Sequence, residues 1–172
     1  HYPLRRQRQM CIRDSLQSLR QRSAQLPKRA VLTLEWIDPL MIGGTWMPEL
    51  IECAGGEALI ARAGEHAPII EADILSKLDP APEVVVVKPC GFPLTKTLQE
   101  QGALRELLSD LDWPAVKTNQ LYLADGNAYF NRPGPRLVES AELLACCIHP
   151  EVFGDPAQRF PGEAVRLELN AK

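Results

Sequence analysis

Residues 84–87 have the sequence VVVV, a run of four β-branched apolar residues. Such a run favours a strand that is buried on both faces, as in the middle of a parallel sheet. Residues 30–36 (AVLTLEW) and 121–124 (LYLA) predict two further strands, and helix-periodic segments lie between the three. The strongest of these helices spans 94–111, where Gly102 predicts a break or kink. This alternation predicts an α/β fold: a three-layer αβα lobe with a mostly parallel sheet.

Shorter elements complete this pattern. Apolar periodicity and capping residues predict further helices over 46–54, 71–78 and 134–148, and a strand or turn over 58–61. At the two ends of the chain we expect a helix over 15–26 that stops before Pro27, and an edge strand within 165–169.

Composition is that of an ordinary globular domain. The chain has 172 residues, of which 45% are hydrophobic and 24% charged, which suits about one domain. No apolar run reaches the ~18 residues that a membrane helix needs. Charge is uneven: residues 1–29 hold eight basic residues and one acid, net +7, whereas 30–172 hold eleven basic and twenty-one acidic residues, net −10. The acidic body argues against nucleic acid as a partner of the folded part.

The first residues differ from the rest of the chain. Residue 1 is His, and QRQMCIRDS (residues 7–15) resembles translated vector or adapter sequence. We therefore expect residues 1–14 to be non-native or disordered, and not to pack on the domain, because they are polar and lack apolar periodicity. The alternative is a basic arm for nucleic acid or a membrane surface.

Five cysteines give no sign of a disulfide framework or a zinc site. Their number is odd, and no CxxC pair occurs. Cys90 is a candidate nucleophile or metal ligand, but no His lies near it in the sequence to serve as its base. We expect His66 and His149 to be surface histidines. No catalytic constellation is recognisable, which favours a binding protein over an enzyme and leaves the catalytic and metal sites unassigned.

The loops that follow the predicted strands are the expected ligand site, because ligands of such sheets bind at the carboxyl ends of the strands. These loops span 35–46, 88–92 and 125–136 and contain several aromatic residues. We expect the rings of four of them to converge on one side of the lobe and to stack on a broad, flat ligand: Trp36, Trp46, Phe92 and Tyr129. The alternative is that these rings belong to the core.

Three strings at this order and spacing resemble a known family: AVLTLEWIDPLMIGGTWMPELIECAGG (30–56), VVVVKPCGF (84–92) and LYLADGNAYFNRPGPRLVESAELLACCIHPE (121–151). They are similar to the C-terminal half of class III periplasmic-type binding proteins. The likeness is to the cobalamin-binding branch of the iron–siderophore and cobalamin family that serves ABC importers, and it covers roughly residues 15–153.

The resemblance implies a domain plan. Proteins of this family have two α/β lobes joined by one long helix, with the ligand between the lobes. Residues 15–28 would then be the end of the inter-lobe helix, 29–153 the C-terminal lobe and 154–172 a tail, with the N-terminal lobe missing. The implied ligand is cobalamin or a related tetrapyrrole, carried as cargo and not as a catalytic cofactor. With half of the cleft absent, we expect an exposed apolar patch and weak or no cobalamin binding by this chain alone.

The resemblance also implies site residues. The positions that match the family's ligand face are Glu35, Trp36, Trp46, Cys90, Gly91, Phe92, Asn127, Tyr129, Phe130, Asn131 and Arg132. Arg132 is in addition a candidate partner for an anionic group of the ligand. Docking onto the importer's permease uses acidic residues in this family, and the candidates here are Glu49, Glu139 and Glu142.

Two alternatives remain open. The same fold would serve a ferric siderophore or haem, and a Rossmann-like enzyme would use Cys90. The family implies the periplasm or the cell surface, whereas five free thiols fit a reducing cytoplasm.

Overall fold

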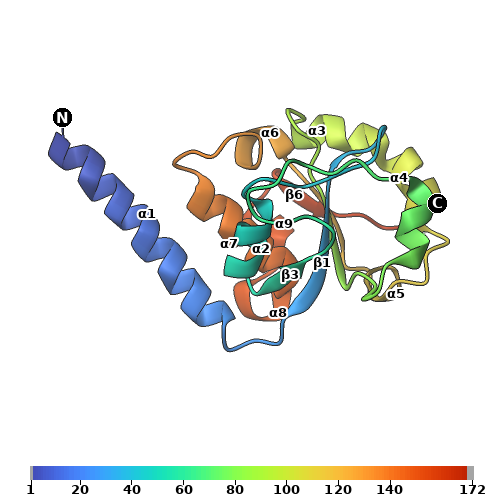
Figure 1. Cartoon of the computed structure of the whole chain (residues 1–172), viewed down its shortest axis with the longest axis horizontal. Helices are drawn as coiled ribbons and strands as arrows, with labels where there is room; N and C mark the ends of the chain where they lie inside the picture. Colours follow the sequence, from blue (N-terminus) through green and yellow to red (C-terminus); the bar gives the residue numbers. More distant parts are fainter. Residues whose placement is uncertain (1, 170–172) are drawn as a thin grey trace.

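The computed structural model describes residues 2–169, which form a six-stranded sheet between two layers of helices (Figure 1). The strands are β1 (Arg29–Trp36), β2 (Met41–Ile42), β3 (Gly56–Ala58), β4 (Val84–Val87), β5 (Leu121–Ala124) and β6 (Ala164–Arg166). Their order is β2-β1-β4-β5-β6, and β3 pairs with the first half of β1. β1 is parallel to β3 and β4, and β4 is parallel to β5, while β2 and β6 add antiparallel edges. The mostly parallel α/β lobe predicted from the sequence is confirmed.

Helices cover both faces of this sheet. One layer holds α1 (Tyr2–Ser23), α2 (Met47–Cys53), α7 (Leu137–Ile148), α8 (Pro150–Phe153) and α9 (Pro156–Arg159). The other face is covered by the 3₁₀ helix η1 (Ala72–Lys77), by α3 (Leu94–Thr97), η2 (Leu98–Glu100), α4 (Gln101–Leu108) and α5 (Pro114–Lys117). The short helix α6 (Gly126–Tyr129) follows β5. Among the described residues, no helix is both long enough and apolar enough to cross a membrane.

The valine run lies at the centre of two cores. Val84 and Val86 point to the side of α2 and α7, whereas Val85 and Val87 point to the side of α4. All four are buried, as predicted for a strand covered on both faces. Because successive strand side chains alternate between faces, these four residues hold both helical layers to the sheet.

The predicted helix over 94–111 is interrupted, but not at Gly102, where the sequence predicted a break or kink. It divides into α3, η2 and α4, and the change falls at η2, while Gly102 lies exposed inside α4. Leu94 and Leu104 are both buried, yet in an uninterrupted helix residues ten apart are turned about 80° from each other. The tighter 3₁₀ turn between them changes the phase, so both leucines can face the same core.

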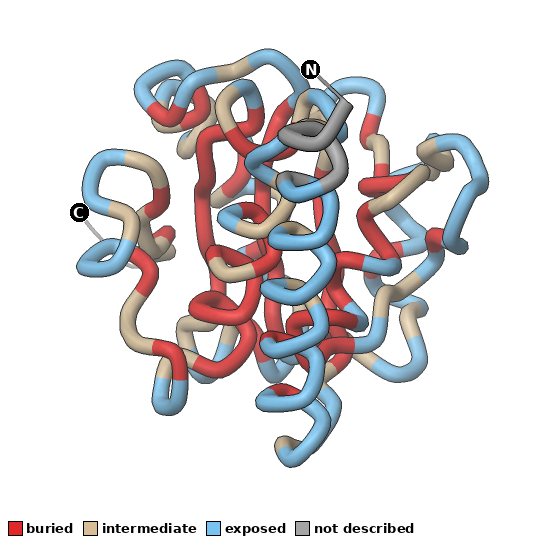
Figure 2. The backbone as a smooth tube through the Cα atoms, turned by 90° about the vertical axis from the view of Figure 1, so that its left-hand side faces the viewer, coloured by how far each residue is buried: buried red, intermediate tan, exposed pale blue. Residues whose placement is uncertain are grey.

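Helix α1 corrects the expectation of a disordered arm over residues 1–14, since the helix runs from Tyr2 to Ser23 without a break, and residue 1 lies outside the described residues. Leu19 is buried against the lobe, and a helix anchored there extends readily through the helix-forming Arg and Gln residues that precede it. The earlier turns stand away from the lobe in Figure 1, Figure 2 colours most of this helix as exposed, and Met10 is 62% exposed. A foreign origin of residues 1–14 stays a prediction.

The junction between α1 and the lobe is tied by polar contacts. The Ser23 hydroxyl donates to the Cys53 carbonyl at 2.8 Å. His149 is buried beside this junction, with its ring nitrogens 3.3 Å from the Gly55 carbonyl oxygen and 3.3 Å from Glu151 Oε1. The expectation of a surface histidine was therefore wrong for His149, because the end of α7 folds its side chain under the α2–β3 turn. His66 is exposed, as expected.

Candidate functional site

The loops after β1, β4 and β5 meet at the carboxyl ends of these strands. The Cys90 amide donates to the Glu35 carbonyl at 3.0 Å, and the Asn127 amide donates to the Phe92 carbonyl at 3.1 Å. In Figure 1, α3 and α6, which follow β4 and β5, lie together at the upper edge of the lobe. We call this surface the strand-end face and define it by five side chains that sit on it: Glu35, Trp36, Cys90, Phe92 and Asn131.

A buried carboxylate fixes the β4 and β5 loops together. Asp125 caps α6 by accepting from the Ala128 amide at 2.6 Å, and it also accepts from the Leu94 amide at 3.2 Å, at the start of α3. The next residue, Gly126, approaches the preceding loop so closely that a Cβ there would lie 2.0 Å from the Pro89 carbonyl oxygen. The β4 and β5 loops beneath the strand-end face are therefore held close together.

An aromatic pair forms the apolar part of this face. The rings of Trp36 and Phe92 pack edge to face with centroids 5.0 Å apart, and Lys96 Nζ lies 3.7 Å from the Phe92 ring centroid. The Trp36 indole donates to the Asp38 carbonyl at 2.9 Å, which fixes its orientation. Both rings remain half-buried and offer area for stacking on a flat ligand.

Polar groups lie beside the aromatic pair. The exposed Cys90 thiol donates to Asn131 Oδ1 at 2.7 Å, which links the β4 loop to the β5 loop. Gly91 takes a positive φ of 76°, the conformation that the tight turn after Cys90 requires. Asn127 and Arg132 are exposed on the β5 loop.

Tyr129 and Phe130 were predicted for the ligand face, but the structure buries both. Tyr129 is 9% exposed and packs edge to face on Phe160, with centroids 5.9 Å apart. The Ser140 hydroxyl of α7 donates to the Tyr129 backbone carbonyl. Burial raises the pKa of the Tyr129 hydroxyl. The short helix α6 turns these two rings toward α7, so the four aromatic rings do not converge as expected.

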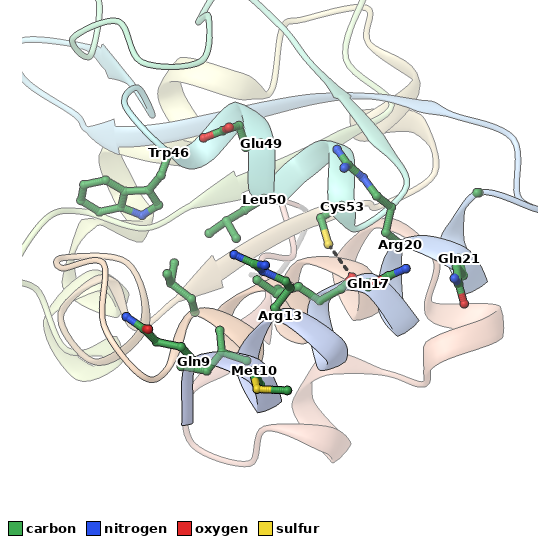
Figure 3. Close-up of a pocket in the computed structure, with 14 residues that line it drawn as sticks. Gln9, Met10, Arg13, Gln17, Arg20, Gln21, Trp46, Glu49, Leu50 and Cys53 are labelled. Carbon is green, nitrogen blue, oxygen red and sulfur yellow. Dashed lines mark hydrogen bonds between the residues drawn. The ribbon is translucent and has the colours of Figure 1, made fainter. Parts of the chain in front are cut away.

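Trp46 lies apart from the strand-end face, in a groove of about 1150 Å³ between α1 and α2 (Figure 3). In Figure 3 Trp46 and Leu50 face Met10 and Arg13 of α1 across this groove. The Trp46 Nε1 atom is buried without a hydrogen-bond partner among the described residues. On the side of α1, long flexible side chains such as Met10 and Arg13 line this groove.

Sequence reasoning missed Lys88, the residue directly after the valine strand. Its side chain is 1% exposed, and its ammonium lies 3.3 Å from Glu35 Oε2. Burial lowers the pKa of Lys88, and the Glu35 carboxylate beside it opposes that shift. The available signal was its position, since a charge that immediately follows a fully buried strand has little solvent to reach.

The candidate docking acids lie in helices α2 and α7. Glu49 is exposed at the start of α2 and forms no ion pair within the described part of the chain, whereas Glu139 lies 3.6 Å from Arg136. Glu142 is half-buried. Within residues 2–169 no cluster of three or more metal-ligating side chains occurs.

Comparison with known proteins gives a clear result for structure only. No family model matches the sequence, and no curated protein matches it significantly. An ABC transporter substrate-binding protein from Listeria monocytogenes EGD-e is similar in structure, with a TM-score of 0.68 and 18% identity over 83% of this chain and 56% of that chain. The periplasmic vitamin B12 binding protein BtuF of Vibrio cholerae has a TM-score of 0.61 and 20% identity over 79% and 50%. S. aureus IsdE complexed with heme has a TM-score of 0.63 and 17% identity over 80% of this chain and 54% of that chain.

These similarities confirm the fold expected from the resemblance to class III periplasmic-type binding proteins. The chain spans about half the length of the solved structures it matches. It has the fold of one half of such a binding protein.

Proposed function

We propose that this chain is the ligand-binding lobe of an ABC-importer solute-binding protein, with cobalamin or a related corrinoid as its cargo. The observation that carries the proposal is the strand-end face, where the Trp36–Phe92 pair lies beside polar groups on loops that Asp125 ties together. A flat, largely apolar ring system with polar substituents at its rim matches such a surface. Similarity to solved binding proteins for vitamin B12 and heme supports the same class of ligand.

The proposal includes a second lobe. Helix α1 would be the end of a helix that joins the two lobes, and a preceding lobe would cover the strand-end face and fill the groove between α1 and α2. The exposed early turns of α1 and the half-length match to the solved structures support this arrangement. The orphan donor at Trp46 Nε1 would then find its acceptor in the preceding lobe.

A permease and a location outside the cytoplasm belong to the same proposal. Glu49 is our first candidate for docking, because its carboxylate is exposed and forms no ion pair with any residue whose side chain is described, whereas Glu139 faces Arg136. The location would be the periplasm or the cell surface. Substituting Glu49 by Gln in a two-lobed chain is expected to lower transport while leaving ligand affinity unchanged.

A titration of the ¹⁵N-labelled chain with cyanocobalamin, followed by NMR, tests the ligand site. Because the second lobe of this proposal is not part of the titrated chain, we expect weak binding, detected at high ligand concentration as shifts of the Trp36 indole and of the backbone over 88–92. The Trp113 indole, which is buried and donates to the Leu75 carbonyl at 3.2 Å, is the internal control and should not move. Shifts confined to Trp46 would contradict the proposed site, and so would the absence of any shift in a chain that carries both lobes.

Haem is the second candidate ligand, favoured by the structural similarity to IsdE complexed with heme. A parallel titration with haemin decides between the two by affinity. The enzyme alternative based on Cys90 requires its thiol to act as a nucleophile, whereas in the structure this thiol donates to Asn131. If Cys90 is alkylated faster than the exposed Cys11, the result would favour the enzyme alternative.

A further inference from the structure

A charged pair lies at the base of the strand-end face. Lys88 follows β4, and its amide donates to the Leu34 carbonyl at 2.9 Å, so its backbone continues the parallel ladder beyond the strand. Its side chain is buried, while that of Glu35 is 25% exposed. The pair thus extends from the core to the surface, with the ammonium inside and the carboxylate at the ligand face.

The surroundings of Lys88 leave space for an ammonium group. A Cβ at position 43 would lie 3.3 Å from Lys88 Nζ and 2.5 Å from Thr33 Oγ1, so Gly43 keeps this space open. The Phe130 ring centroid lies 5.6 Å from Nζ, a distance at which an aromatic face attracts a cation.

A buried ion pair of this kind seldom adds stability. Removing a lysine ammonium from water is costly, and an apolar side chain of similar volume is often as stable or more so. Folding alone therefore does not explain a lysine at position 88. The position of the pair beneath the strand-end face indicates a role in the ligand site.

The geometry leaves one oxygen of Glu35 for a ligand. Oε2 accepts from Lys88, and Oε1 accepts no hydrogen bond from the described residues. The Lys88–Glu35 pair has no net charge when both groups are ionised, but Glu35 Oε1, the oxygen left for a ligand, is a hydrogen-bond acceptor. A ligand amide or hydroxyl can donate to it, whereas a ligand carboxylate would face another carboxylate oxygen.

We propose that Lys88 is a positioning residue that holds Glu35 as an acceptor on the ligand face, and that this pair selects ligands with amide or hydroxyl donors over ligands with carboxylates. The inference rests on the proposed function and narrows its ligand class. It favours a corrinoid whose rim carries carboxamides over a tetrapyrrole or chelate that presents carboxylates there.

The first experiment needs no ligand. A chain labelled with ¹³C-lysine is titrated with base and followed by NMR, and the signal lost in Lys88→Met assigns Lys88. Because Glu35 raises the pKa of Lys88 against the effect of burial, Glu35→Gln should move the Lys88 midpoint to lower pH. An unchanged midpoint would show that the two groups do not interact, and would overturn the inference whatever the ligand.

The second experiment uses two corrinoids with the same ring. Dicyanocobinamide carries amides at the rim, and dicyanocobyrinic acid carries carboxylates. NMR titration measures the affinity for each corrinoid, and the unmodified chain should bind dicyanocobinamide more tightly. Glu35→Gln should weaken the binding of dicyanocobinamide by roughly 10-fold, in line with a hydrogen bond to a charged group. Binding of the carboxylate form should be unchanged or tighter. Equal loss for both corrinoids would overturn the selection.

A double-mutant cycle separates positioning from packing. Lys88→Met nearly keeps the volume of the side chain. Introduced into the unmodified chain, it should lower the affinity for dicyanocobinamide, but in the Glu35→Gln background it should change that affinity less than about 2-fold. An equal loss in both backgrounds would show that Lys88 acts by packing and not through Glu35. If neither corrinoid binds even a chain that carries both lobes, the proposed function itself is contradicted, whereas the lysine titration still judges the pair.

Discussion

The loops after β1 and β5 occupy equivalent positions in the fold but differ in what their aromatic residues do. Trp36, at the end of β1, stays half-buried on the surface and packs on Phe92. Tyr129, in the loop after β5, turns into the core beneath α7. The difference lies in the local structure, because the β5 loop folds into the short helix α6, whose last turn faces α7. Position after a strand therefore does not by itself make an aromatic residue a ligand contact.

The largest effect that would test this contrast is expected at Tyr129. Replacing it by Ala removes a buried ring from the core and should lower the free energy of unfolding by about 3–5 kcal/mol. Urea unfolding followed by circular dichroism measures this loss. Tyr129→Phe is the control and should cost far less, since it keeps the ring. Unchanged stability of Tyr129→Ala would mean that the ring does not serve as core.

A substitution at Gly126 tests how the loop after β5 is held against the loop after β4. A methyl group at this position would meet the Pro89 carbonyl, so Gly126→Ala should lower stability by ~1–3 kcal/mol and disturb the amide signals of 88–92. Gly102→Ala is the matched control, because open space surrounds Gly102 in α4 and alanine favours a helix. Equal effects of both substitutions would argue against a tight contact between the loops.

Trp36→Ala is expected to behave in the opposite way to the tyrosine variant. It should leave the melting temperature nearly unchanged but weaken corrinoid binding by ~1–3 kcal/mol, by analogy with the stacking of a base on an aromatic side chain. Melting and equilibrium dialysis on the same preparation, in a chain that carries both lobes, separate the two effects. A large loss of stability with intact affinity would assign Trp36 to the core instead.

Thiol reactivity gives the smallest and simplest test. Cys90 on the strand-end face and Cys11 on α1 are exposed, whereas Cys53, Cys146 and Cys147 are buried. Burial also raises the pKa of Cys146 to about 11 and that of Cys147 well above its usual value. At pH 8 a thiol reagent should therefore label two cysteines quickly in the native chain and all five in urea. Rapid native labelling of a third thiol would show that α7 opens.

Some of this structure was accessible from the sequence. The VVVV run, the β1 and β5 strands and the alternation of strands with helices predicted a mostly parallel α/β lobe, and a weak signal in the tail predicted the edge strand at β6. These features follow from hydrophobic periodicity, which is a local property of the chain. The meeting of the β1 and β4 loops also followed, because the carboxyl ends of parallel strands lie at one edge of a sheet.

Tertiary structure decided which side chains of those loops remain available. Lys88 looked like an ordinary loop lysine, and only the packing of β1, Gly43 and Phe130 around it makes it a buried partner of Glu35. Tyr129 looked like a loop aromatic until α7 covered it, and the continuity of α1 depended on the anchoring of Leu19. By itself, the sequence determined where strands and helices form, because that depends on neighbouring residues. Burial and charge pairing depend on residues far apart in the chain, which are brought together only when the layers pack.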